Sequence, residues 1–361
     1  MIAMRHLLLS CDAVGGVWQY STDLARALEP HGCQVTLALM GPAPNEAQLA
    51  EAGMISNLHL VETGLELDWL ATEPAPVLVA EARLAEMAGD LRADIVQLHT
   101  PALTASGRYS CPVVAVQHSC VATWWAAVHG GTMPDDFAWR TDLVARGLKH
   151  ATLAITPSAA FAQAVRSVYG VTPVAVHNGR DFVVPAGRQM QDYVFTAGRL
   201  WDEGKNVSIL DEAAAQLSVP FLAAGSTRAP HGAALTLDTI TPMGALNATA
   251  LVERLSHRPV FASAARYEPF GLAVLEAALA GCALVLSDIA TFRELWDGAA
   301  IFVDPDDVKG FATAIERLLQ DPASRIAAGQ SAHDRARRYT PASTAAAMAA
   351  HYATAAQRAA A

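Results

Sequence analysis

The sequence lacks any run of lysine or arginine, and 35 acidic residues against 25 basic ones give a formal net charge of −10. A nucleic-acid partner requires a broad basic surface, so we do not expect one. The same shortage disfavours docking onto anionic lipid, although a small basic or aromatic patch is compatible with weak peripheral membrane contact.

The sequence also lacks CxxC spacing and a long apolar run. An odd number of scattered cysteines is typical of small buried side chains in a reducing compartment. Glu276 interrupts the longest apolar stretch, which argues against a transmembrane helix. Residues 6–11 are apolar and Asp12 follows at once, which predicts a buried first strand rather than a signal peptide. We therefore expect a soluble cytoplasmic protein. The cysteines are Cys11, Cys33, Cys111, Cys120 and Cys282.

Several catalytic signatures are missing. There is no P-loop, no G-x-S-x-G motif and no His/Cys spacing suited to a metal. The only D-x-D is Asp304–Pro305–Asp306, where the proline and a following helical pattern indicate a turn with an N-cap rather than a metal site. We expect no metal ion and no cofactor.

What the sequence does contain is a long alternation of apolar runs and helical patterns. At 361 residues, with 52% hydrophobic and 17% charged residues, two domains are expected. Such alternation predicts parallel sheets covered by helices on both faces. A first series of strands is predicted at 6–11, 34–40, 94–99, 112–118, 153–158 and 173–179. A second series is predicted at 193–200, 219–225, 259–264, 282–288 and 299–304.

The two series predict an α/β protein of two Rossmann-like, doubly wound domains that face each other across a cleft. We place the N-terminal domain at 1–182 and the C-terminal domain at 183–339. The connection at 180–192 is mixed polar and contains Pro185 and Gly187. The alanine-rich segment of about 340–361 favours a helix that packs back on the first domain.

Two glutamates seven residues apart, Glu268 and Glu276, stand in the most informative stretch. If a helix starts at about Phe270, the backbone amides of Phe270, Gly271 and Leu272 form an open N-terminus that attracts anions. Gly271 also permits close approach to the backbone. This arrangement suits a phosphorylated sugar, with amides for phosphate and one carboxylate each for sugar and ribose hydroxyls.

The stretch EPFGLAVLE resembles the E-x7-E signature of glycosyltransferase family 4, a group with the GT-B fold. Four other segments resemble further elements of this family and occur in the right order. They are VGGVWQYSTDLARAL, HNGRD, TAGRLWDEGKN and CALVLSD. The resemblance implies a retaining hexosyltransferase that uses a nucleoside-diphosphate sugar in polysaccharide or glycolipid assembly. Its acceptor would be a glycan, a lipid-linked sugar or a small molecule. Glu268 would contact donor-sugar hydroxyls and Glu276 the ribose.

Arg199 and Lys205 lie six positions apart in a loop that enters a helix, so they can converge on the donor diphosphate. In a metal-free site these cations would offset the charge that develops on the leaving group. The alternative is that both are surface cations paired with Asp202 and Glu203.

Gly15 and Gly16 connect the first strand to the first helix, and the family places a donor or acceptor contact there. A third glycine, which a dinucleotide fingerprint requires, is missing. His118 ends an apolar run, and the family has a histidine near this point that contacts the donor sugar. His99 ends the preceding run and competes for the same role.

Trp124, Trp125 and Trp139 follow His118 in a region that the family uses for acceptor recognition. Aromatic faces stack on sugar rings and also anchor proteins at membrane surfaces. The alternative is that these side chains pack in the core.

The chain departs from the common family pattern at Ala264–Ala265, His177 and Arg180. These changes remove no charge carrier, so a catalytic protein is still expected. A glycogen-synthase-like transferase, a sugar-nucleotide epimerase and a non-catalytic sugar-binding homologue remain alternatives. The residues around Met243–Leu246 do not identify the donor base.

Overall fold

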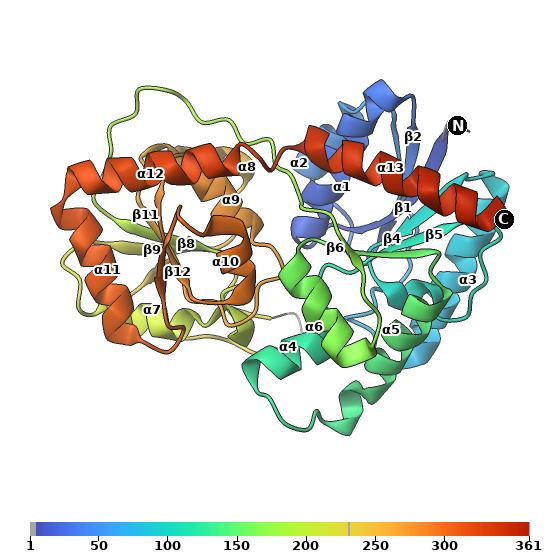
Figure 1. The fold of residues 1–361 in the computed structure, drawn as a ribbon, viewed down its shortest axis with the longest axis horizontal. Coiled ribbons are helices and arrows are strands. Elements are labelled where there is room, and N and C mark those ends of the chain that lie inside the picture. Colours follow the sequence, from blue (N-terminus) through green and yellow to red (C-terminus); the bar gives the residue numbers. More distant parts are fainter. Residues whose placement is uncertain (1–4, 230–231, 361) are drawn as a thin grey trace. The chain divides into compact units, whose positions relative to one another are not determined.

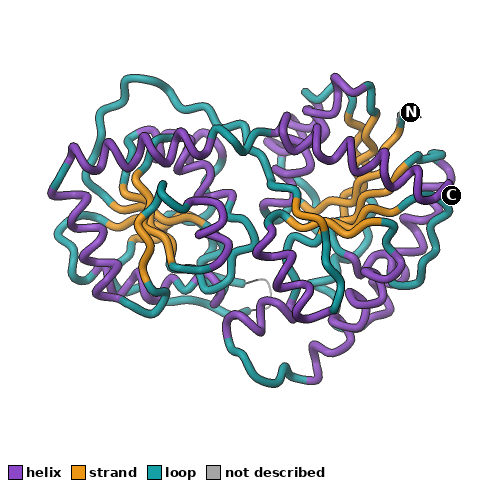
Figure 2. The backbone as a smooth tube through the Cα atoms, in the orientation of Figure 1, coloured by secondary structure: helices purple, strands orange, loops and turns teal. Residues whose placement is uncertain are grey.

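The computed structural model describes residues 5–229 and 232–360, which form two α/β units (Figures 1 and 2). Unit 1 extends to Arg180 and resumes at Thr340, and unit 2 comprises Asp181–Tyr339. All pairings between the named strands are parallel. The predicted class, an α/β protein with two doubly wound Rossmann-like units, is confirmed.

The sheet of unit 1 has the strand order β3-β2-β1-β4-β5-β6-β7. Its first strands are buried on both faces, as uninterrupted apolar runs require in a covered parallel sheet. The strands are β1 (His6–Asp12), β2 (Gln34–Met40), β3 (Leu58–Glu62), β4 (Ile95–Leu98), β5 (Val113–Val116), β6 (Leu153–Thr156) and β7 (Val174–Ala175).

Helices from both ends of the described chain build unit 1. The helices are α1 (Gly16–Leu28), α2 (Glu46–Gly53), α3 (Pro74–Asp90), α4 (Val121–Val128), α5 (Ala138–His150), α6 (Ala159–Tyr169) and α13 (Pro341–Ala360). The last of these, α13, buries a stripe formed by Ala345, Met348, Tyr352 and Ala355 in the same core as α1. This spacing places all four side chains on one face of the helix.

Unit 2 repeats the pattern with the strand order β10-β9-β8-β11-β12-β13. Its strands are β8 (Val194–Ala197), β9 (Phe221–Ala224), β10 (Thr241–Pro242), β11 (Val260–Ser263), β12 (Ala283–Ser287) and β13 (Ile301–Val303). Its helices are α7 (Val207–Ala214), α8 (Ala248–Ser256), α9 (Leu272–Leu279), α10 (Ala290–Trp296), α11 (Val308–Gln320) and α12 (Pro322–Ala336). Two apolar clusters pack against its sheet.

Each sheet reverses its strand order at one point, between β1 and β4 in unit 1 and between β8 and β11 in unit 2. In open parallel sheets, ligands bind beyond the carboxyl ends of the strands at this topological switch point. The loops after β1 and β4, and those after β8 and β11, are therefore where ligand-binding groups are expected.

The predicted strands agree with the structure to within a few residues. Two strands were not predicted, namely the half-exposed β3 and the two-residue β10. Within the described residues, no helix has both the length and the apolar character needed to cross a membrane. None of the five cysteines forms a disulfide, and the expectation that all are buried is wrong for Cys111 and Cys120, which are half-exposed. Residues 1–4, the start of the predicted N-terminal domain, lie outside the described residues.

Candidate active site

The loop after β8 carries Arg199 near its start. Its Nη2 donates to Oδ2 of Asp202 at 3.1 Å. The Cζ atom of the guanidinium lies 5.9 Å from the ring centroid of Trp201. About half of the side chain is exposed. The pairing with Asp202 that the alternative interpretation named is therefore present, while much of the guanidinium remains open to solvent.

Lys205 ends the short helical turn Glu203–Lys205 in the same loop. Its Nζ donates to Oε2 of Glu268, in the loop after β11, at 2.5 Å. The two side chains are only 18% and 16% exposed. The alternative pairing with Glu203 is therefore wrong for Lys205. A cation and a hydrogen-bonding carboxylate meet here on the two loops that flank the switch point of unit 2.

Asn206 joins three loops of this edge. Its backbone is left-handed, with φ of 53°, and its side-chain amide donates to the carbonyls of Ala264 at 3.0 Å and Pro305 at 2.8 Å. The backbone amides of Arg266 and Tyr267 both donate to the carbonyl of Gly204. The loops after β8 and β11 are thus bonded to each other, which fixes Lys205 relative to Glu268.

The loops after β8 and β9 also approach each other closely at two glycines. Gly225 has φ of +131°, and a Cβ atom added to it would lie 1.8 Å from the carbonyl oxygen of Gly198. Neither backbone can move away without disturbing the loop that carries Arg199 and Lys205.

Replacing Gly225 with alanine is therefore expected to lower the free energy of unfolding of unit 2 by about 3 kcal/mol, because backbone strain and a backbone clash add. Urea unfolding of the full chain measures this loss. Gly298→Ala is the matched control, since Gly298 has φ of +76° and open space around its Cβ. It should cost only about 1–2 kcal/mol. Equal losses in the two variants would show that the contact with Gly198 does not matter.

The helix after Glu268 begins later than predicted. Gly271, with φ of +94°, is its N-cap, and α9 starts at Leu272 rather than at about Phe270. Phe270 is therefore buried in the loop before the helix, and the unpaired amides of the first turn start at Leu272. The delay occurs because Gly271 is left-handed, where a Cβ atom would also lie 3.3 Å from Cγ of Glu268.

Glu276 lies just over one turn into α9 and is almost fully buried. Glu276 is therefore not a solvated carboxylate on the helix surface. Burying a carboxylate costs free energy unless polar groups compensate.

In unit 1, the predicted glycines join β1 to α1. Gly15 is extended, with φ of −175°, and Gly16 is the first residue of the helix. A Cβ atom at Gly15 would meet no atom within 4 Å, so packing within the protein does not require a glycine at this position. Oδ1 of Asp12 accepts the amide of Val14 at 2.8 Å and shapes the turn.

The two candidate histidines form a pair at the carboxyl ends of β4 and β5. Nδ1 of His99 and Nε2 of His118 lie 2.7 Å apart. The ring of Tyr20 packs edge-on against both, with centroids 5.3 and 4.8 Å away. Burial lowers the pKa of His118 to about 4, and burial together with the charge of His118 lowers the pKa of His99 well below its usual value. Both rings are therefore neutral near pH 7.

The predicted acceptor tryptophans lie on α4. Their rings contact His129, with centroids 5.2 Å away for Trp124 and 4.4 Å for Trp125. Nε1 of Trp125 donates to the carbonyl of Gly130 at 3.0 Å. Both side chains are half-buried, so each combines local packing with an accessible part. Trp139 instead packs its ring under the guanidinium of Arg140, 4.4 Å away.

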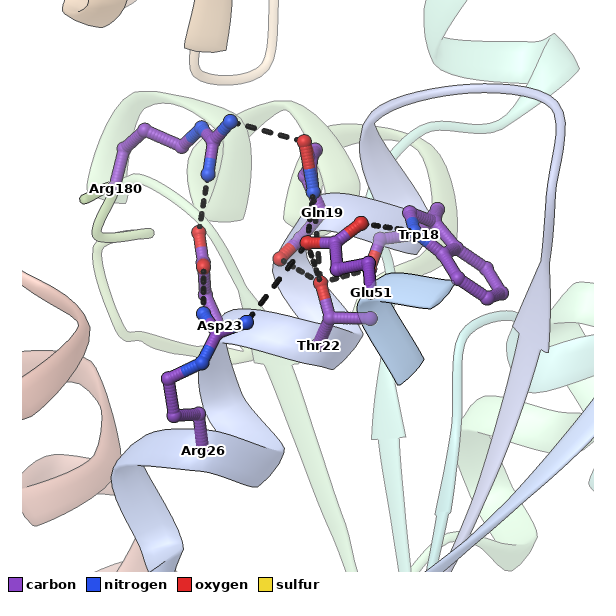
Figure 3. A network of polar contacts seen from close by, with 7 residues as sticks. All are labelled: Trp18, Gln19, Thr22, Asp23, Arg26, Glu51 and Arg180. Atoms are coloured by element: carbon purple, nitrogen blue, oxygen red, sulfur yellow. Dashed lines mark hydrogen bonds and ion pairs between the residues drawn. The ribbon is translucent and has the colours of Figure 1, made fainter. Parts of the chain in front are cut away.

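Arg180, where the sequence departs from the family pattern, joins a polar network with α1 (Figure 3). Its Nη1 donates to Asp23 at 3.0 Å and its Nη2 to Gln19 at 2.9 Å, and the Arg180 and Asp23 side chains are 9% and 3% exposed. Glu51 extends the network by accepting from Trp18 and Gln19. Sequence reasoning did not identify this pair, because 157 residues separate its members.

No group of three or more His, Cys, Asp or Glu side chains within residues 5–229 and 232–360 is arranged to hold a metal ion. The D-x-D motif forms a turn in which Oδ1 of Asp304 accepts the amide of Asp306 at 2.9 Å. Asp306 pairs with Arg266, and the N-cap of α11 is the next residue, Asp307.

Two Rossmann-like units, each with a parallel sheet and with polar and charged groups at its switch point, form the architecture of the GT-B fold. Family models match the chain as Glycosyltransferase Family 4 over residues 14–183 and as Glycosyl transferases group 1 over residues 191–321. The chain therefore belongs to the family 4, or group 1, glycosyltransferases, as its motifs predicted.

Among curated proteins, the chain is 25% identical to a glycogen synthase of Mycobacterium tuberculosis over 92% of this chain and 90% of that protein. Among solved structures, it is similar to a sucrose-phosphate synthase from Thermosynechococcus elongatus, with a TM-score of 0.77, 16% identity and coverage of 97% and 98%. It is also similar to Anabaena HepE in complex with UDP and glucose, with a TM-score of 0.71, 18% identity and coverage of 97% and 99%.

Proposed function

We propose that this glycosyltransferase moves a sugar from a nucleoside-diphosphate sugar to an acceptor hydroxyl with retention at the anomeric carbon and without a metal ion. The contact between Lys205 and Glu268 carries the proposal. A cation for phosphate and an acceptor for sugar hydroxyls lie together at the switch point, where the adjacent diphosphate and sugar of such a donor would be bound.

In this proposal Arg199 and Lys205 bind the diphosphate and offset the negative charge that grows on it as the sugar leaves. Amides of the first turn of α9, beginning at Leu272, add to this positive field. Glu268 accepts hydrogen bonds from the sugar, and Glu276 binds the ribose. Glu276 lies in α9, is almost fully buried and carries a carboxylate that can accept hydrogen bonds from ribose hydroxyls.

The chemical step breaks the bond between the anomeric carbon and the phosphate oxygen, whose electron pair leaves with the nucleoside diphosphate. The acceptor oxygen bonds to the same face of that carbon, and its proton passes to the departing phosphate. Retention then needs no carboxylate nucleophile. We assign His118, with the turn at Gly15 and Gly16, to orienting the transferred sugar, and Trp124 and Trp125 to the acceptor.

The acceptor is proposed to be a sugar or a glucan chain, since proteins named glycogen synthase and sucrose-phosphate synthase are among the relatives. Chain elongation on a glucan is favoured by the likeness to glycogen synthase, which extends over 92% of this chain. Formation of an interconverted nucleotide sugar in the absence of acceptor would instead identify an epimerase.

A panel of nucleotides tests the donor site. Thermal unfolding is followed with UDP, GDP, ADP and dTDP, each with and without EDTA. A nucleotide at about 100 times its dissociation constant should add about 2.7 kcal/mol, which raises Tm by about 5–10 °C. UDP is the first candidate because the relative HepE binds it. One nucleotide should stabilise the protein equally with and without EDTA.

Lys205→Ala is the control variant, since it should greatly reduce this shift while leaving the uncomplexed protein folded. Stabilisation that disappears with EDTA would contradict the metal-free proposal. No shift with any of the four nucleotides would contradict the donor site itself.

A further inference from the structure

The pair formed by His99 and His118 continues into α1. Nε2 of His99 lies 3.1 Å from Oγ of Ser21, while its Nδ1 faces Nε2 of His118 at 2.7 Å. The three side chains therefore form one chain of hydrogen bonds, and each contact in it must contain one proton. Which atom carries each proton follows from the end of the chain at Ser21.

The hydroxyl of Ser21 has one proton to give. Its Oγ lies 2.7 Å from the carbonyl oxygen of Val17, one turn earlier in α1. A carbonyl only accepts, and two oxygens at this distance repel each other unless a proton lies between them. The hydroxyl proton of Ser21 therefore belongs to Val17, and towards His99 the serine offers only a lone pair.

The remaining protons follow in order. Nε2 of His99 must carry a proton to donate to Ser21, so in the neutral ring Nδ1 of His99 is bare. Nε2 of His118 must then carry the proton that lies between the two rings. We infer that His99, oriented by Ser21, is a positioning residue that holds His118 as the neutral Nε2–H tautomer, with its bare Nδ1 available to accept a hydrogen bond from a sugar hydroxyl.

Packing around the rings supports a fixed arrangement. The backbone amide of His99 donates to the buried Oγ of Ser10 at 3.0 Å, and the ring of Tyr20 contacts both histidines. Among the described residues, Nδ1 of His118 has no hydrogen-bond partner. A histidine fixed in this way accepts from a hydroxyl but cannot donate to one.

This inference rests on the proposed function only in assigning a sugar hydroxyl to His118; the tautomer itself is independent of activity. Long-range ¹⁵N–¹H NMR of histidine-labelled full-length protein identifies the protonated nitrogen of each ring, and His118→Ala assigns the signal. The expected result is a protonated Nε2 and a bare Nδ1. In Ser21→Ala, His99 loses the acceptor that sets its proton, so His118 should populate both tautomers.

The matched control is Ser167→Ala, which removes a serine with the same bond to the carbonyl four residues earlier, on α6. It should leave the His118 signal unchanged. A wild-type His118 protonated at Nδ1, or a His118 tautomer that does not respond to Ser21→Ala, would overturn the inference.

Turnover provides a separate readout. His99→Phe removes the acceptor for Nε2–H of His118 and is expected to lower kcat about tenfold, the value of one hydrogen bond, with little change in KM. His99→Asn places an amide oxygen near the lost Nδ1 and should restore most of the rate. If His118→Ala turned over at the wild-type rate, the role of His118 in the proposed function would be wrong, whereas the NMR result would still decide the tautomer.

Discussion

Substitution of Lys205 by alanine is expected to lower kcat by about 100-fold or more, the loss typical when one group that stabilises transition-state charge is removed. The nucleoside diphosphate gains negative charge as the sugar leaves. The ammonium of Lys205 is largely shielded from solvent and lies against the carboxylate of Glu268. Its ammonium acts in a partly desolvated position, where a charge interacts more strongly than in water. Steady-state release of nucleoside diphosphate measures the effect.

Lys309→Ala is the matched control, because Lys309 is exposed on α11. It should retain the wild-type rate. Lys205→Arg keeps the charge but changes its geometry, so it should recover part of the lost activity. A Lys205→Ala enzyme that works as fast as Lys309→Ala would remove Lys205 from the catalytic machinery.

Replacing Arg180 with alanine is expected to lower the free energy of unfolding of unit 1 by about 3 kcal/mol. This is the lower end of the range for breaking a buried ion pair, because Asp23 keeps a second contact with Arg26 at 3.1 Å. Burial raises the pKa of Asp23, and the charge of Arg180 opposes that rise. Without Arg180 the buried carboxylate would lose most of its compensation. Denaturant unfolding of the full chain near pH 7 measures the loss.

Arg26→Ala removes the other, largely exposed partner of the same carboxylate and should cost at most about 1 kcal/mol. The pH dependence separates charge from packing. The pKa of Asp23 should rise further in Arg180→Ala, so protonation at low pH relieves the unpaired charge and the deficit should shrink as the pH falls. A deficit that is the same at every pH would indicate lost packing instead.

The alternation of apolar runs was sufficient to predict both sheets, because strands buried on two faces leave an uninterrupted apolar signal. The same reasoning explains the two strands that were missed. The segment Leu58–Glu62 lies at the edge of its sheet and has no fully buried residue, so it lacks an uninterrupted apolar run, and Thr241–Pro242 is too short to leave any pattern.

The candidate site was predicted as positions but not as contacts. The sequence identified Lys205 and Glu268 separately, yet their pairing depends on Asn206 bonding three loops together. The link between His99 and His118 likewise depends on two neighbouring strands ending at the same level. Contacts between residues so far apart in the chain follow from strand order, which a single sequence does not encode locally.

The start of α9 shows a different kind of error. A helix was expected from about Phe270. The left-handed backbone at Gly271 delays the helix to Leu272, and a residue's φ angle cannot be read from its neighbours when that residue is glycine.

The return of α13 to unit 1 has a consequence for the order in which the molecule is made. The core of unit 1 includes Ala345, Met348 and Tyr352, which leave the ribosome after all of unit 2. At a synthesis rate of about 5–20 residues per second, roughly 10–30 s separate Arg180 from these residues. During that interval the nascent chain can complete unit 2, while the apolar face that α13 will cover stays exposed. The core of the unit whose synthesis begins first can therefore be completed only after the helix that is synthesised last.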